Sequence, residues 1–125
     1  NKFRLKSQIT NLDKIKFRTI TDKEGEIFDT LIFNFNNKTL CNKFLNQYLK
    51  FYSTKNVPDA LKWHFSGYWS KMFGKETKYY DNWHNNWKSS RNLLERSVAI
   101  PIFVKDTKNK IDKHAEFINK LLKNL

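Results

Sequence analysis

The sequence predicts an α+β domain in which helices cover one face of a small, mainly antiparallel sheet. Two early segments alternate apolar and polar residues, a later run is continuously apolar at strand length, and two segments carry apolar residues at helical spacing. Their order is strand, strand, helix, strand, helix, which is typical of a two-layer fold. The 125 residues suffice for a single domain.

The first two elements are expected to form an antiparallel pair. Residues 14–20, KIKFRTI, place Ile15 and Phe17 on one side of a half-buried strand. Residues 29–36, DTLIFNFN, form the second strand, whose apolar face consists of Leu31, Phe33 and Phe35. A short polar connection favours antiparallel pairing. Residues 1–10 fit either the tail of a helix or a lead-in.

The connection between these strands, TDKEGE at residues 21–26, is expected to be a turn. Gly25 is the residue expected to adopt a positive φ. Acidic residues cluster around this turn, and we expect all of them to be solvated: Asp22, Glu24, Glu26 and Asp29.

Residues 37–52 predict the first helix, which Asn37 or Thr39 could cap. Its apolar stripe consists of Leu40, Phe44, Leu45, Tyr48 and Leu49. Cys41 lies beside that stripe and is expected to be a small, half-buried filler.

The last two elements follow near the C-terminus. Residues 97–104, SVAIPIFV, suit a central strand, except that Pro101 lacks an N–H and implies a bulge or an unpaired edge. Residues 106–125 predict the clearest helix, begun by Asp106 or Thr107. Its buried stripe consists of Ile111, Ala115, Ile118, Leu121 and Leu122. His114, in the same helix, is expected at the surface or its boundary.

An irregular aromatic insertion of about residues 53–95 separates the first helix from the third strand and becomes helical near residues 89–95. Within it, KNVPDALKWHFSGYW at residues 55–69 is aromatic without a helical or strand period. Such a segment is typical of a shaped loop, and shaped loops often carry sites. His64 is either a packed loop histidine or a histidine that contacts a ligand.

Composition narrows the function classes. The net charge of +12 invites a nucleic-acid interpretation, but only four of the 24 basic residues are arginine and the lysines are spread along the chain. We therefore favour a solvated surface and keep a basic binding module for nucleic acid or an acidic partner as the alternative. Cys41 is the one cysteine, so no internal disulfide forms. The opening NKFRLKSQIT lacks the apolar region of a signal peptide, which indicates the cytoplasm.

No motif supplies a self-sufficient active site. Three glycines cannot build a phosphate-binding loop, and no Gly-x-Ser-x-Gly elbow occurs. His84, in NWHNNW, has no second histidine at a useful spacing, so we expect no metal site.

An ordered series of segments resembles a known family. IFDTLIFNF, FYSTKNVPDALKWHFSGYW and LLERSVAIPIFVKDTKNKIDKHAEFINKLL are similar to the C-terminal small domain of the DegT/StrS family. This family comprises pyridoxal-phosphate-dependent sugar aminotransferases of fold-type I. The resemblance spans about residues 15–122 and implies the small-domain fold of these enzymes, including members that act on octulosonates or nucleotide sugars for surface polysaccharides.

The resemblance implies that this chain is the C-terminal part of a longer enzyme. The family's large domain carries the Schiff-base lysine and binds the pyridoxal 5'-phosphate, and this chain has no matching segment. The chain alone is therefore expected to be inactive, and no residue of it is assigned a catalytic role. The partners implied are the enzyme's own large domain, a keto-sugar, an amino-acid donor and a second subunit in a homodimer. Membrane association is not expected.

The resemblance also assigns residues 55–69 to the substrate cleft, which the small domain closes on one side. The substrate-binding candidates are Lys55, Asn56, Trp63 and His64, with Trp69 behind them. Aromatic faces stack on sugar or base rings, and lysine and histidine bind anionic groups. These aromatic residues could instead pack the insertion onto the sheet. An independent small enzyme is the least favoured alternative because no catalytic set is found.

Overall fold

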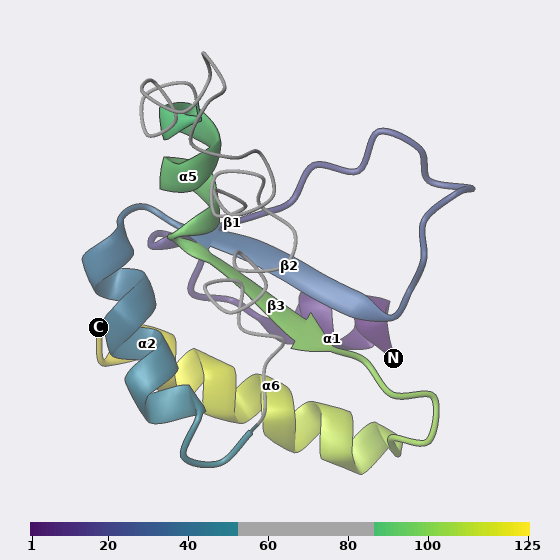
Figure 1. Ribbon diagram of the computed structural model, residues 1–125. Helices are drawn as coiled ribbons and strands as arrows, with labels where there is room; N and C mark the ends of the chain where they lie inside the picture. Colours follow the sequence, from purple (N-terminus) through teal and green to yellow (C-terminus); the bar gives the residue numbers. More distant parts are fainter. Residues whose placement is uncertain (53–86) are drawn as a thin grey trace, which may run out of the picture.

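The computed structural model describes residues 1–52 and 87–125 (Figure 1). The described elements, in chain order, are α1 (Lys2–Gln8), β1 (Ile15–Phe17), β2 (Thr30–Phe35), α2 (Lys38–Tyr48), α5 (Lys88–Leu94), β3 (Ser97–Pro101) and α6 (Lys108–Lys123). These elements confirm the predicted α+β class and the predicted order of strands and helices. Most of the aromatic insertion lies outside the described residues, and its end forms α5, as expected.

The three described strands form one antiparallel sheet in the order β1-β2-β3. The pairing of β1 with β2 matches Phe17 with Phe33, and the pairing of β2 with β3 matches Leu31 with Ile100. The expectation that residues 97–104 form the central strand is wrong for the described sheet, because β2 takes that place. Within the described sheet, β3 pairs with β2 alone.

Of the two alternatives predicted for Pro101, a bulge or an unpaired edge, the described sheet has the second, because β3 is an edge strand there and its register is continuous. The register is continuous to the pair Thr30–Pro101, and the next backbone bond runs from the Ile102 N–H to the Asp29 carbonyl at 2.7 Å. In an antiparallel ladder, residues that exchange backbone bonds alternate with residues that do not. Pro101 falls at a position that exchanges none with β2, so its missing N–H costs this ladder nothing.

Helices α1, α2 and α6 lie on the same side of the sheet and build the second layer (Figure 1). Along β2, burial alternates: Leu31, Phe33 and Phe35 are buried, while the residues between them are half-buried. Both α1 and α2 contact β2, and both also contact α6. The predicted two-layer arrangement is therefore confirmed.

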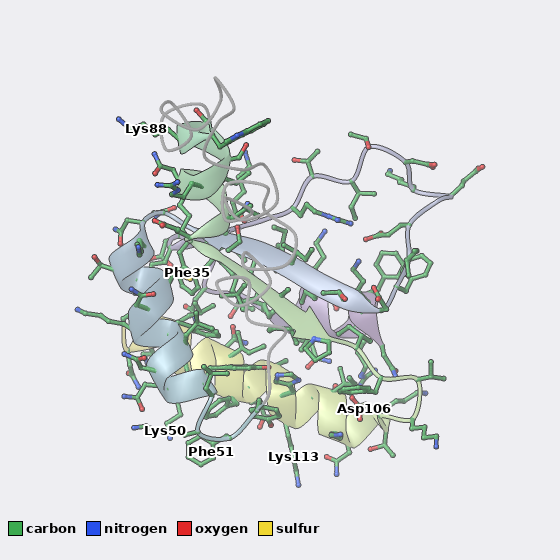
Figure 2. The ribbon with its side chains drawn as sticks, in the orientation of Figure 1. Phe35, Lys50, Phe51, Lys88, Asp106 and Lys113 are labelled. Carbon is green, nitrogen blue, oxygen red and sulfur yellow. The ribbon has the colours of Figure 1, made fainter. Side chains whose placement is uncertain are left out.

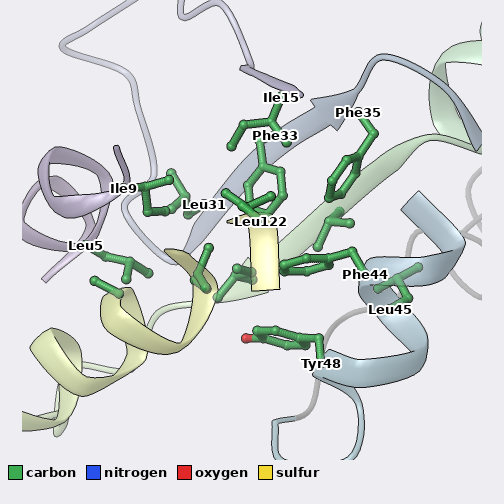
Figure 3. Close-up of a cluster of buried hydrophobic side chains, with 14 of the residues drawn as sticks. Leu5, Ile9, Ile15, Leu31, Phe33, Phe35, Phe44, Leu45, Tyr48 and Leu122 are labelled. Carbon is green, nitrogen blue, oxygen red and sulfur yellow. The ribbon is translucent and has the colours of Figure 1, made fainter. Parts of the chain in front are cut away.

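Aliphatic side chains and a cluster of aromatic rings fill the space between the layers (Figure 3). The Phe33 ring contacts Phe17, Phe35 and Phe44 at centroid distances of 6.1, 5.7 and 5.8 Å, all nearly edge-on. Such edge-to-face pairs add about 0.5–1.5 kcal/mol to what burial alone provides. The ring cluster continues from Phe44 to Tyr48, which are stacked at 5.2 Å.

The two long helices begin as their sequences predict. The Asn37 side chain accepts a hydrogen bond from the Leu40 N–H at 2.9 Å, and the Thr107 hydroxyl accepts one from the Lys110 N–H at 3.3 Å. Three stripe positions deviate from complete burial: Leu49 is 46% exposed, beyond the end of α2, and Leu40 and Leu121 are only partly buried.

The first ten residues include a helix rather than only a lead-in. Leu5 of α1 and Ile9 just after it are buried in the core, and α1 packs along α6. Arg4 donates two hydrogen bonds of 2.7 Å to the Asp112 carboxylate, and Gln8 donates another of 2.6 Å. These bonds hold the pKa of Asp112 at about 2.

Gly25 does not have the positive φ that the turn predicted. The need for glycine comes instead from a close approach, because a Cβ at this position would collide with the Asp22 carboxylate. That carboxylate accepts hydrogen bonds from the backbone N–H groups of Glu24 and Gly25, each at 3.0 Å.

None of the helices in residues 1–52 and 87–125 combines the length and apolar composition needed to cross a bilayer.

Replacing Phe33 by alanine is expected to destabilise the domain by about 3–5 kcal/mol, because the ring is completely buried and leaves a cavity at the centre of the cluster. The free energy of unfolding in urea measures the change. Val104→Ala is the control, since Val104 is 97% exposed and its truncation should change stability by no more than about 0.5 kcal/mol. Equal stability losses in the two variants would contradict this core.

Candidate functional site

The substrate-contact candidates from the sequence cannot be placed in this fold. Lys55, Asn56, Trp63, His64 and Trp69 all lie outside the described residues. His84 lies outside them as well. These assignments therefore stay sequence predictions.

Tyr52, the last described residue before the aromatic insertion, lies against a buried histidine. The rings of Tyr52 and His114 stack almost parallel, with centroids 4.1 Å apart. On its edge, His114 Nε2 forms a hydrogen bond of 2.6 Å with the Tyr48 hydroxyl. The expectation that His114 lies at the surface is wrong, because only 8% of it is exposed. The entry to the insertion is thus fixed to α6 through this histidine.

Burial keeps His114 neutral at physiological pH. Burial lowers the pKa of His114 to about 4; nearby Asp106 opposes the shift, and Lys110 adds to it. Burial, with a smaller contribution from Tyr52, raises the pKa of Tyr48, so its hydroxyl keeps its proton. The pair is an uncharged hydrogen-bonded anchor, and its enclosure gives it no access to a substrate.

Cys41 is more deeply buried than predicted. The side chain is fully enclosed, and its Sγ lies 3.9 Å from the Ser97 carbonyl oxygen. Burial raises the pKa of the thiol to about 11, so it stays protonated at neutral pH. Cys41 is therefore a packing residue and not a nucleophile.

One acid of the turn between β1 and β2 is not solvated. Glu26 forms an ion pair with Lys2 of α1, and the two side chains are only 3% and 5% exposed. Lys2 Nζ also lies 6.0 Å from the centre of the Phe28 ring. The pair fastens the β1–β2 connection to α1. No local pattern predicts this pair, since the partners are 24 positions apart in different parts of the fold.

Two hollows flank this connection. A polar hollow of about 510 Å³ is lined by Arg18 and by the acidic residues Asp22, Glu26 and Asp29, among others. An apolar groove of about 520 Å³ lies between Lys2, Phe28 and residues 102–104. In the polar hollow, Asp22 already accepts backbone bonds and Glu26 already pairs with Lys2, so it is not a free carboxylate cluster. Over residues 1–52 and 87–125, no group of three or more histidines, cysteines or acids could hold a metal ion.

The outward faces of α2 and α6 carry lysines. Lys43 lies on the exposed side of α2, and Lys50 follows seven residues later, just beyond the end of the helix. Lys113 and Lys120 are exposed on α6 at the same spacing of seven residues. Figure 2 shows Lys50, the exposed Phe51 and Lys113 projecting away from the core. The α2 segment contains no acidic residue. On α6, however, the exposed Glu116 lies on the same face, three residues after Lys113, so the outward charges of that helix are mixed.

Lowering the pH is expected to destabilise the protein through His114. The folded pKa of about 4 lies below the ordinary 6.5, so the unfolded chain binds this proton more tightly. The contribution is fully present above pH 6.5 and is lost as the pH falls toward 4, by roughly 3 kcal/mol in total. Urea unfolding between pH 7 and pH 4 should show a shallower pH dependence in His114→Gln, which retains a hydrogen-bonding side chain. Parallel curves for the two proteins would refute the buried, neutral histidine.

Glu26→Gln is expected to cost about 3–5 kcal/mol, because it leaves the Lys2 ammonium buried without its counter-charge. The double variant Lys2→Met with Glu26→Leu should regain most of that loss. Thermal unfolding of Lys2→Met, of Glu26→Leu and of the double variant measures the coupling. An additive double variant would show that the two side chains do not interact.

Comparison with known proteins assigns no family. No protein-family model matches the chain, and no curated protein matches it.

Proposed function

We propose that this chain is the C-terminal small domain of a pyridoxal-phosphate-dependent sugar aminotransferase of the DegT/StrS type. The enzyme transfers an amino group from an amino acid to a keto-sugar, of the nucleotide-sugar or octulosonate kind, for surface polysaccharide synthesis in the cytoplasm. In this role the domain closes one side of the substrate cleft of the large domain, and the full enzyme is a homodimer.

The observation that carries the proposal is the pairing of two strands that come from the first and the last of the three similar segments. DTLIF and SVAIPI lie about 65 residues apart in the sequence, and they form β2 and β3 in continuous antiparallel register, with Leu31 opposite Ile100. A chance likeness of separate segments need not bring them together. The pairing supports reading them as parts of one domain, as the resemblance implies.

The apolar groove does not fit pyridoxal phosphate. The apolar groove is lined by Phe28, Phe103 and Val104, and its one lysine, Lys2, is paired with Glu26. Neither a free lysine nor a cluster of phosphate-binding groups faces it. The cofactor is therefore assigned to the large domain, and the chain alone is expected to lack activity.

The fixed entry to the aromatic insertion favours a binding role for residues 55–69. Tyr52 is held between His114 and the Phe117 ring, at centroid distances of 4.1 and 5.2 Å. A loop that projects from a rigid position can present side chains to a ligand at low entropic cost. Lys55, Asn56, Trp63, His64 and Trp69 are the residues proposed to do so.

A basic binding module remains the second candidate, and the outward lysines of α2 and α6 favour it. Lys43, Lys50, Lys113 and Lys120 give an exposed surface that is mainly basic, interrupted by Glu116 of α6, to which a nucleic acid or an acidic protein could bind. Phe51, 71% exposed between Lys50 and α6, could stack on a base. The scarcity of arginine weakens this candidate against the first.

Expressing the complete reading frame that contains this chain tests the first candidate. With amino-acid donors and a panel of keto-sugars, the full protein should bind pyridoxal phosphate and transfer the amino group, whereas the isolated chain should do neither. Trp63→Ala and His64→Ala should raise the KM for the sugar by roughly tenfold, the loss of one good contact, while Phe51→Ala should not. A full protein without bound cofactor, together with salt-dependent binding of an oligonucleotide by the isolated chain, would favour the second candidate.

A further inference from the structure

Large apolar side chains gather at one end of the molecule. Ten such side chains are exposed among the described residues, and half of them lie around the N-terminus of α1, the end of the β1–β2 connection and the turn after β3. We refer to these five as the apolar end patch: Phe3, Ile27, Phe28, Phe103 and Val104. Isolated exposed apolar residues are ordinary, but a contiguous group of them marks a surface that another surface covers.

Four residues of the apolar end patch adjoin one another around a groove, whereas Ile27 borders the neighbouring polar hollow. The rings of Phe3 and Phe28 contact each other at 5.3 Å between centroids. Phe28, Phe103 and Val104 line the groove of about 520 Å³ described above. Val104 is 97% exposed and Ile27 is 75% exposed, which is costly for β-branched apolar side chains that nothing covers.

Three segments hold the apolar end patch in shape. The Asn1 side-chain amide donates hydrogen bonds to the carbonyls of Phe103, at 2.9 Å, and Asp106, at 3.1 Å. The buried pair of Lys2 and Glu26 joins the β1–β2 connection to α1. A surface fixed in this way loses little conformational freedom when another surface binds it.

The chemistry of the patch fits an apolar occupant. Two charged residues line its groove, Lys2, which Glu26 neutralises, and Asp29. Such a surface suits neither a phosphorylated sugar nor a polyanion, and it differs in this from the outward faces of α2 and α6.

We propose that the apolar end patch is the surface against which the large domain of the aminotransferase packs, an inference that rests on the proposed function. Asn1 itself lines the groove, so the polypeptide that precedes Asn1 in such an enzyme enters the domain at this surface. Because the large domain would be covalently connected to Asn1, beside the groove, an apolar surface of that domain would have a high effective concentration at the apolar end patch. A second copy of the chain is a poorer occupant, because two chains of net charge +12 repel each other.

Hydroxyl-radical footprinting of phenylalanine side chains tests the assignment by comparing the isolated chain with the protein encoded by the complete reading frame. Labelling of Phe3, Phe28 and Phe103 should be several-fold lower in the complete protein. Phe51, which is 71% exposed on the far side of the helical layer, is the internal control and should be labelled equally in both. Phe44 is fully buried and should stay unlabelled in both, which verifies that each preparation is folded.

A matched pair of variants adds a second measurement. Phe103→Lys with Val104→Lys, in the complete protein, should loosen the contact and increase labelling of Phe3 and Phe28. Leu49→Lys with Phe51→Lys places the same charges on an exposed apolar pair elsewhere and should leave that labelling unchanged.

The outcomes separate the inference from the proposed function. A complete protein that binds pyridoxal phosphate yet leaves Phe3, Phe28 and Phe103 as reactive as in the isolated chain overturns the assignment of the patch alone. A reading frame without a large domain overturns both. Protection that appears in the isolated chain as its concentration rises, together with a doubling of its mass, identifies a second copy as the occupant and also overturns the assignment.

Discussion

The fold depends on the burial of one face of β2. Leu31, Phe33 and Phe35 occupy alternate positions of this strand, and all are at most 2% exposed. On either side, β1 and β3 extend the same apolar face, and α1 and α2 pack onto it. Because Phe33 contacts rings from β1, β2 and α2, its removal would weaken both the sheet and its junction with α2.

Three surfaces follow from this arrangement. The outward side of α2 and α6 carries lysines, the end of the sheet near Asn1 carries the apolar end patch, and Tyr52 leads into the aromatic insertion from a position fixed by His114. A domain that packs on a larger partner and reaches a loop toward that partner's cleft needs an apolar contact surface and a rigid loop origin. The chain provides both, and this accords with the proposed aminotransferase role.

Local patterns were sufficient to predict most of the fold, whereas distant pairings were not. Alternation revealed β2, and helical spacing with an N-cap revealed α2 and α6. The burial of His114 could have been predicted as well, since its position falls on the apolar stripe of α6 with Ile111, Ala115 and Ile118. It was missed because histidine is a polar residue. The burial of Glu26 could not be read, because it depends on Lys2 in another element. The candidate site in residues 55–69 remains a sequence prediction.

Determining the coding DNA upstream of Asn1 tests the central claim most directly. The proposed aminotransferase predicts an open frame that continues upstream and encodes a large domain containing a lysine followed by a glycine-rich segment, the features expected to bind pyridoxal phosphate. A stop codon shortly before Asn1, with a start codon beside it, would contradict the claim and leave a domain that acts without a cofactor-binding partner in the same chain.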